Sequence, residues 1–276
     1  MDGARLSAVS TDQLGSPIRV TISEVTVDLC SVRAVLDAVT QRASACGARP
    51  LVVGSVNLDH FHHFGSGRAN PDCAALGPAL DWLMLADGAP IVARARLKTR
   101  QNWPRITGAD LLPMVLEQAA GTGHRVGFLG GLPQVHDRLR AVLHERYPGL
   151  AVSGLWAPDR ADLIDPDRSD ALAGDIAAAD TDVLVVGLGK PLQELWIARH
   201  GLTAGARVLL AFGASADFLA GAATRAPEWM QRCGLEWSYR LGREPRRMAR
   251  RYLIQGPAAV VRLRKAAVGP ALPWHA

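Results

Sequence analysis

The chain has 276 residues, 49% of them hydrophobic and 21% charged, with a formal net charge of +5 at pH 7. This is an ordinary globular composition, long enough for one large α/β domain or two small ones. No apolar run reaches the ~18 residues of a membrane-spanning helix and no signal peptide opens the chain, while the positive charge favours anionic partners.

Short apolar runs alternate with helical patterns along the chain. Strands are expected at residues 19–22, 50–56, 83–85, 125–129, 150–153, 182–186 and 208–212. Helices are expected from about 31 to 45, after 71, and at 91–98, 108–122, 133–146, 169–179 and from 191, with Asp28 and Ser31 as caps of the first. Apolar strands separated by helices predict an α/β fold with a doubly wound, mainly parallel, Rossmann-like sheet.

Three segments are expected from the composition. Residues 1–17 are polar, and we expect them to form a mobile leader. We expect residues 18–225 to form an α/β core and residues 226–276 to form a basic helical appendage. The appendage carries arginines at near-helical spacing, among them Arg240, Arg246 and Arg247. Guanidinium groups grip phosphate oxygens bidentately, although such a run is more often a solvated helix face.

Two glycine turns follow apolar strands and precede helices. They are Gly130-Gly131 and Gly187-Leu188-Gly189. Doubly wound sheets bind ligands at such turns, because a helix N-terminus offers free N–H groups to phosphate. The competing interpretation is a pair of tight connections. Neither turn is a complete G-x-G-x-x-G, which argues against a dinucleotide site.

A carboxylate beside a glycine, Asp87-Gly88, follows the strand that ends at Leu85. Glycine would let a substrate approach the carboxylate closely. The alternative is a turn aspartate bonded to its own backbone, which is common.

Three histidines, His60, His62 and His63, fall within four residues. Their spacing raises a metal hypothesis, but only Asp59 stands nearby as a further ligand, so we expect a surface or ligand-facing loop rather than a metal site. The four cysteines form no CxxC pair and predict reduced thiols of a cytoplasmic protein: Cys30, Cys46, Cys73 and Cys233.

The segment RAPEWMQRCGLEWSYRLGREPRRMARRYL, from Arg225 to Leu253, resembles the C-terminal motif of the TagA/WecG/CpsF bacterial glycosyltransferases of family 26. The resemblance extends through the FLGG-x-P turn at Gly130 and the VGLG-x-P-x-QE-x-W motif at Gly187, and covers about residues 19–263. This chain departs from the family at one lysine. Lys190 precedes the proline of the second motif, whereas the family usually has its lysine after it.

The resemblance implies roles for individual residues. Asp87 would be the general base, and Arg105 would face the leaving diphosphate. Ser55 and Asn57 match the family's T-x-N motif and would bind sugar hydroxyls or order the base. Diphosphate or sugar contacts would come from the remaining matched positions: Gly130, Gly131, Gly187, Gly189, Lys190, Gln193, Arg240, Arg246 and Arg247.

The resemblance also implies an activity. We expect an inverting hexosyl- or N-acetylhexosaminyltransferase that moves a sugar from a UDP-sugar donor to a polyprenyl-diphosphate-linked saccharide in cell-surface polysaccharide synthesis. Cations and turn amides would replace a divalent metal, so no cofactor and no metal are expected. The protein would lie on the anionic inner face of the cell membrane without binding nucleic acid. The sequence does not decide whether the protein forms a homo-oligomer. Deleting the appendage from Arg240 onward is expected to leave a folded core.

Two other classes remain open. A nucleotide-dependent oxidoreductase or epimerase would share the doubly wound sheet, but should carry a full glycine fingerprint and an acidic residue ~20 positions further on. A nucleic-acid-binding protein would account for the basic tail, but should offer aromatic stacking platforms, and the chain has only five Phe and three Tyr.

Overall fold

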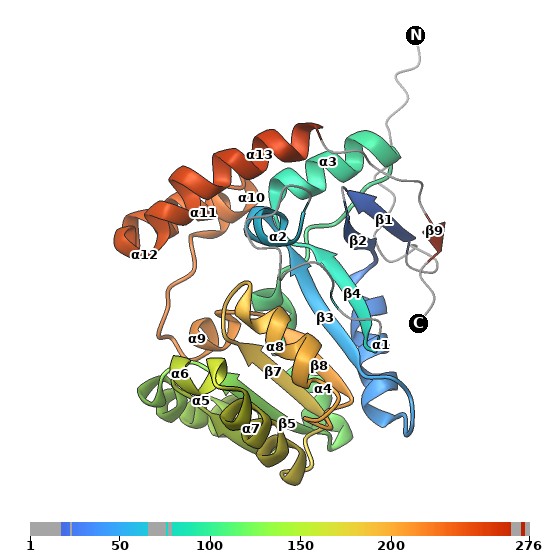
Figure 1. Cartoon of the computed structure of the whole chain (residues 1–276), viewed down its shortest axis with the longest axis vertical. Helices are drawn as coiled ribbons and strands as arrows, with labels where there is room; N and C mark the ends of the chain where they lie inside the picture. The colour runs from blue at the N-terminus through green and yellow to red at the C-terminus, as the bar shows by residue number, and fades with distance from the viewer. Residues whose placement is uncertain (1–17, 23, 66–75, 77–78, 266–271, 274–276) are drawn as a thin grey trace.

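The computed structural model describes residues 18–22, 24–65, 76, 79–265 and 272–273. A nine-stranded sheet in the order β6-β5-β7-β8-β3-β4-β2-β1-β9 forms its centre. The inner strands pair in parallel, and among the described strands β1 alone is reversed, pairing antiparallel with both β2 and β9. The predicted doubly wound α/β fold is confirmed (Figure 1).

The strands of the sheet are short, and those at its centre are buried on both faces. Val, Leu and Ala fill them, as expected where helices cover a parallel sheet on both sides. Their bounds are β1 Ile18–Ile22, β2 Val25–Leu29, β3 Leu51–Val56, β4 Asp81–Ala86, β5 Arg125–Gly130, β6 Ala151–Trp156, β7 Val183–Gly187, β8 Val208–Ala211 and β9 Leu272–Pro273.

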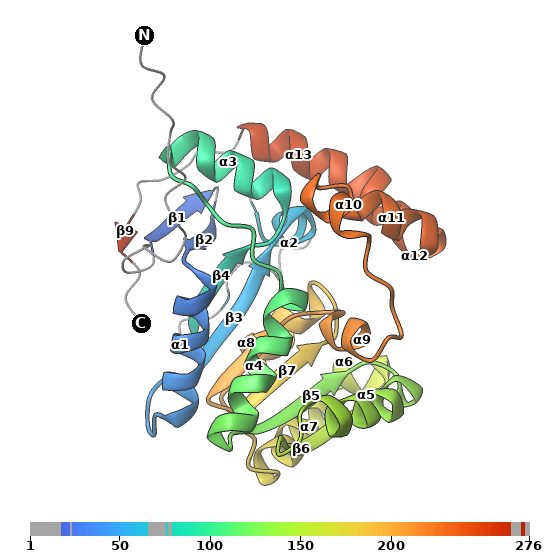
Figure 2. The ribbon, with the colours of Figure 1, turned by 180° about the vertical axis from the view of Figure 1, so that it is seen from behind.

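The helices cover the sheet in two layers. One hydrophobic cluster includes residues of α1, α4, α5 and α9 and the other includes residues of α2, α3, α7, α8 and α13. Figures 1 and 2 show these layers from opposite sides. The bounds are α1 Val32–Ser44, α2 Leu58–Phe64, α3 Ala89–Thr99, α4 Gly108–Thr122, α5 Pro133–Arg146, α6 Arg160–Ile164, α7 Pro166–Ala178, α8 Leu192–His200 and α9 Ser215–Leu219.

The start of the sheet differs from the prediction. Ser31 does cap α1, its hydroxyl accepting from the Ala34 amide at 3.1 Å, but Asp28 belongs to the unpredicted strand β2. The buried Asp28 carboxylate accepts from the Arg19 side chain at 2.8 and 3.0 Å and from the Met84 amide at 2.7 Å. Because these partners come from β1 and β4, the local sequence does not predict the strand.

The histidine segment also differs from the prediction. It forms the helix α2 rather than a surface loop, and Asn57 caps it by accepting from the His60 amide at 3.0 Å. Phe61 and Phe64 point into the core, and His60 is buried with them. The helix expected after residue 71 begins outside the described residues.

The appendage is a chain of helices along one side of the molecule (Figures 1 and 2). It comprises α10 Glu228–Arg232, α11 Glu236–Arg243, α12 Pro245–Ala249, the π-helix Arg250–Gln255 and α13 Gly256–Lys265. The last helix packs on α2 and α3, and buries Ala259 and Leu263 in the core. Removing the chain from Arg240 onward would open this core, so truncation is not expected to leave an undisturbed body. No helix among the described residues is long and apolar enough to span a bilayer.

Candidate active site

The parallel strands bring the predicted residues to one edge of the sheet. Asn57, Asp87, Gly131 and Leu188 directly follow β3, β4, β5 and β7, so all four lie at the carboxyl ends of the strands. The helices that follow β8 and β3, which are adjacent strands, cover opposite faces of the sheet. Such a switch point is where open α/β sheets form their ligand crevice.

Asp87 is held in a turn against the end of β3. Its amide and that of Gly88 both donate to the Val56 carbonyl, at 3.1 and 3.2 Å. A Cβ on Gly88 would lie 3.1 Å from the Asn57 backbone, so only glycine fits this approach without a shift. The Asn57 amide group donates to the Asp87 carboxylate at 3.4 Å, and the Ser55 hydroxyl bonds it too. The structure thus brings Ser55, Asn57 and Asp87 together.

Four charged or polar groups set the proton affinity of Asp87. Burial of the carboxyl raises its pKa above the ordinary aspartate value, and the negative charge of Glu236 raises it further. Arg105, Lys190 and the Ser55 hydroxyl act in the opposite direction by favouring the carboxylate. A raised pKa suits a general base, because it strengthens the pull on a substrate proton.

Arg105 reaches this group from the loop before α4. The Ile106 amide donates to the Ala86 carbonyl at 3.0 Å, which attaches the loop to the end of β4. The guanidinium of Arg105 lies 3.6 Å from the carboxylate of Glu236, the first residue of α11. The appendage therefore contributes a charged side chain next to Asp87.

Lys190 lies inside the protein beside this group. Its side chain is 6% exposed and its ammonium forms an ion pair with Glu194, which is fully buried. The ammonium also donates to the Ser55 carbonyl at 2.9 Å and lies 3.3 Å from His60 Nδ1. With these partners, Lys190 supports the end of β3 at Ser55, and we expect little of its charge to be available to a ligand.

The buried His60 and Glu194 have displaced pKa values. Burial and the Lys190 charge lower the pKa of His60 to about 4, so the ring is neutral near pH 7. The pKa of Glu194 falls to about 2: burial opposes this, but attraction to Lys190 and the contact with His60 outweigh it. The folded protein therefore carries a Lys190–Glu194 ion pair against a neutral His60.

These pKa values predict acid lability. His60 takes up a proton in the unfolded chain below about pH 6.5 but resists it in the folded protein down to about pH 4. Stability is then lost as pH falls through this window, by about 3 kcal/mol in total, and the Glu194 contribution is lost as pH falls from about 4.5 towards 2.

Urea unfolding from pH 8 to 4 measures this loss. His60→Asn should flatten the dependence between pH 6.5 and 4. The matched variant His144→Asn, at an exposed site on α5, should retain it. Equal slopes for the two variants would contradict the role of His60.

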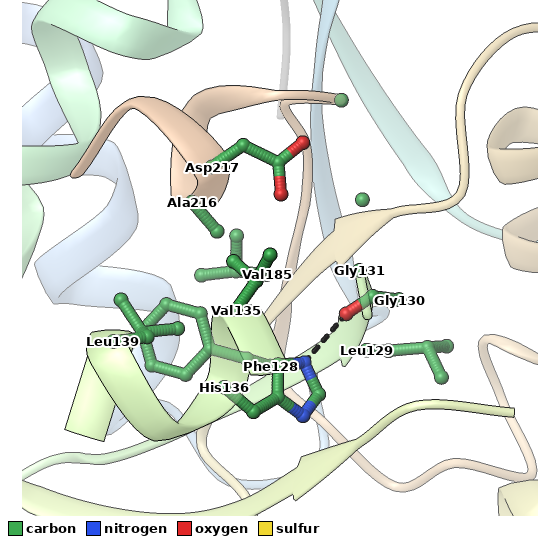
Figure 3. A pocket seen from close by; sticks show the side chains of 12 residues that line it. Phe128, Leu129, Gly130, Gly131, Val135, His136, Leu139, Val185, Ala216 and Asp217 are labelled. Carbon is green, nitrogen blue, oxygen red and sulfur yellow. Dashed lines mark hydrogen bonds between the residues drawn. The ribbon is translucent and has the colours of Figure 1, made fainter. Parts of the chain in front are cut away.

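A pocket lies where β5 and β7 end (Figure 3). Gly130 has φ +100° and a Cβ there would lie 2.7 Å from the Gly187 carbonyl oxygen, so the two strand ends meet through glycine. His136 bonds the Gly130 carbonyl at 2.7 Å from within α5. Gly130, Gly131, Gly187 and Gly213 line the pocket, and Asp217 of α9 lies at its edge in Figure 3.

Gln193 and Gly189 flank this pocket without lining it. The Gly189 carbonyl accepts from the Gln193 amide at 2.9 Å. The buried side-chain amide of Gln193 donates to the Ala211 carbonyl at 3.0 Å and to Glu194 at 3.1 Å. Its Oε1 accepts no hydrogen bond from the described residues and lies 3.6 Å from the Cβ position of Gly213, a pocket residue.

The arginines of the appendage lie in different surroundings. Arg240 extends over the Phe218 ring of α9, 5.6 Å from its centroid, whereas Arg246 is exposed on α12. The side chain of Arg247 falls outside the described part of the structure. Arg225 joins the appendage to the body, donating to Asp110 at 2.6 Å and to Gln231 at 2.8 Å.

Residue patterns drew attention to His60 but placed it in a loop, and they did not single out Glu194 or Glu236 as site residues. The QE pair after Gly189 and the GLEW segment around Glu236 were visible, but nothing local indicated that Glu194 pairs with Lys190 or that Glu236 faces Arg105. Among the described residues, no three histidine, cysteine or acidic side chains converge as metal ligands.

A carboxylate, a guanidinium and glycine turns at the carboxyl edge of a doubly wound sheet place the chain among α/β proteins with a ligand site at the switch point. A family model described as the glycosyl transferase WecG/TagA/CpsF family matches residues 20–271. The chain belongs to this family, as the motifs indicated.

A curated relative from Bacillus subtilis (strain 168) is named N-acetylglucosaminyldiphosphoundecaprenol N-acetyl-beta-D-mannosaminyltransferase. It is 32% identical over 167 residues, which cover 60% of this chain and 63% of the relative. The chain thus matches somewhat under two thirds of that relative's length.

Proposed function

We propose that this protein is an inverting glycosyltransferase that moves a sugar from a UDP-sugar to a polyprenyl-diphosphate-linked saccharide. The observation that carries the proposal is the placement of Asp87, whose carboxylate touches Asn57 and lies within the electrostatic reach of Arg105. A base and a cation next to each other are what inverting transfer from a diphosphate donor requires.

The reaction is a single displacement at the anomeric carbon. The acceptor hydroxyl oxygen forms the new bond from the face opposite the diphosphate, and its proton passes to Asp87. The bond from the anomeric carbon to the diphosphate oxygen breaks, and UDP departs with the electron pair. Arg105 and the appendage arginines stabilise the charge that develops on the leaving oxygen.

We assign the donor diphosphate to the edge of the sheet between the glycine turns and Arg105. The pocket at Gly130 and Gly187 adjoins the start of α5, where free backbone N–H groups attract anions. Arg105 lies on the Asp87 side, and Arg240, Arg246 and Arg247 come from the appendage. These cations and amides take the place of a divalent metal in the proposed mechanism.

The acceptor is proposed from the relative's name. That enzyme glycosylates an N-acetylglucosaminyl diphosphoundecaprenol, so a lipid-linked amino sugar is the first acceptor to try. Cell-surface polysaccharide synthesis is the corresponding process, with the protein at the inner face of the cell membrane.

A panel of UDP-sugars with a short-chain polyprenyl-diphosphate N-acetylglucosamine tests the proposal, with product mass read directly. We expect transfer from at least one donor, at a rate unchanged by EDTA, and thermal stabilisation by UDP but not by NAD or DNA. Loss of activity in EDTA that Mg²⁺ or Mn²⁺ restores would refute metal independence. No stabilisation by UDP and no product would refute the activity.

The proposed membrane contact is carried by exposed apolar side chains beside the arginines. Leu253 and Ile254 are 60% and 68% exposed, and residues 240–265 hold nine basic residues and one acidic one. Apolar side chains that insert at an interface and basic ones near anionic lipid act together, the latter at ~1 kcal/mol each.

We therefore expect Leu253→Ser/Ile254→Ser to lower binding to anionic vesicles by at least about tenfold, since each side chain contributes roughly 1.5–3 kcal/mol when buried. Co-sedimentation at low and high salt measures it. A control pair with similar exposure elsewhere, Ile164→Ser/Leu202→Ser, should bind like the wild type. Equal binding by both pairs would contradict docking through this surface.

A further inference from the structure

Arg105 lies within the electrostatic influence of three carboxylates, those of Asp87, Asp110 and Glu236. Asp87 follows β4 in the body, whereas Glu236 begins α11 in the appendage. The Arg105 guanidinium is 3.6 Å from Glu236 Oε2, too long for a good hydrogen bond. The two side chains are 27% and 21% exposed, so a ligand can reach both.

The charges near Asp87 do not balance. Asp87 and Glu236 are both acidic, and the two cations that act on Asp87 are Arg105 and Lys190. Lys190 is already paired with the buried Glu194. Asp110 also feels the charge of Arg105, but it is paired with Arg225 at 2.6 Å. Arg105 is therefore left to compensate Asp87 and Glu236, and a nucleotide diphosphate would bring further negative charge to the same guanidinium.

The existing contact is weak enough to exchange. A partly exposed ion pair without hydrogen-bond geometry contributes at most about 1 kcal/mol. A diphosphate can take the planar fork of arginine bidentately, which is a stronger interaction. Glu236 therefore occupies Arg105 much as an anionic ligand would, and it can be displaced.

We propose that Glu236 is a positioning residue that holds Arg105, and with it α11, in the free enzyme and releases the guanidinium when the nucleotide diphosphate binds. The proposal rests on the glycosyl-transfer function proposed above. It assigns Glu236 two effects. It competes with the diphosphate for Arg105. Its negative charge also makes the Asp87 carboxylate a stronger base before the donor binds.

Both effects have a definite sign. Glu236→Gln removes the competing carboxylate, so UDP binding should tighten, by up to about fivefold if the contact contributes about 1 kcal/mol. The same change removes a negative charge that raises the Asp87 pKa, and leaves Arg105 to stabilise the Asp87 carboxylate. The acidic limb of the kcat/KM profile should therefore move to lower pH.

A purely structural role predicts the opposite for binding. Glu236 lies in the first turn of α11, where a carboxylate stabilises the helix by roughly 0.3–1 kcal/mol. If Glu236 only anchored α11, its replacement would loosen the appendage and weaken UDP binding. The direction of the change in affinity separates the two roles.

The experiment compares wild type, Glu236→Gln, Glu236→Asp and the control Glu145→Gln, which makes the same charge change at an exposed site on α5. Calorimetry measures UDP affinity, and ¹³C NMR titration of labelled aspartate carboxyls measures Asp87 directly, with Asp87→Asn assigning its signal. We expect tighter UDP binding and a lower Asp87 pKa in Glu236→Gln alone, with Glu236→Asp close to wild type.

Each other outcome is decisive. Unchanged or weaker UDP binding by Glu236→Gln, with normal binding by the wild type, overturns the exchange but leaves the glycosyltransferase proposal standing. An unchanged Asp87 titration overturns the electrostatic effect, whatever the ligand. A wild-type protein that does not bind UDP overturns the proposed function and the exchange together.

Discussion

Asp87→Asn is expected to lower kcat by about 10²–10⁴-fold while leaving the fold and UDP affinity near their wild-type values. The carboxylate lies beside Asn57 and Ser55, and is the proposed acceptor of the proton from the attacking hydroxyl. The amide keeps the shape and a hydrogen-bonding oxygen but cannot take that proton. Initial rates with the productive UDP-sugar, together with calorimetry of UDP, measure the two quantities separately.

The matched control is Asp175→Asn, at an exposed site on α7 remote from the carboxyl ends of the strands. It should turn over like the wild type. Near-normal turnover by a folded Asp87→Asn protein would remove Asp87 from the role of base. Equal loss in both variants would point to a general effect of charge instead.

Lys190→Met is expected to lower the free energy of unfolding by about 3–5 kcal/mol, because it leaves Glu194 buried without its cation. The two side chains are 6% and 0% exposed, so water cannot compensate. The double variant Lys190→Met/Glu194→Gln removes both charges and should recover most of this loss. Urea unfolding of the two single variants, the double variant and the wild type gives the coupling energy.

The double variant also tests whether Lys190 contributes to UDP binding. If Lys190 mainly supports the Ser55 carbonyl, as its 2.9 Å contact indicates, the refolded double variant should bind UDP with near wild-type affinity. A stable double variant with much weaker UDP binding would return Lys190 to the diphosphate site. Lys98→Met, on the exposed surface of α3, is the control for loss of a lysine and should change neither quantity.

The sequence alone determined the parallel sheet and several residues at its carboxyl edge. Runs such as Leu51–Val56 and Val183–Gly187 contain no charged residue and, apart from Ser55, no polar side chain, as is typical of strands covered on both faces, and the carboxyl ends of parallel strands fall on one edge. The parallel direction of the strands placed Asp87 and the glycine turns on the same edge of the sheet. The family motifs added roles for individual residues, and the family is confirmed.

Tertiary structure alone decided which charges remain available at that edge. Lys190 looked like a ligand for phosphate, but the fold brings Glu194 and the Ser55 carbonyl to its ammonium. Glu236 is 131 positions from Arg105 in the sequence, and only the path of the appendage makes them neighbours. Local patterns report propensity and burial, whereas the partner of a buried or shared charge is set by contacts between distant segments, because its energy depends on geometry that no local pattern encodes.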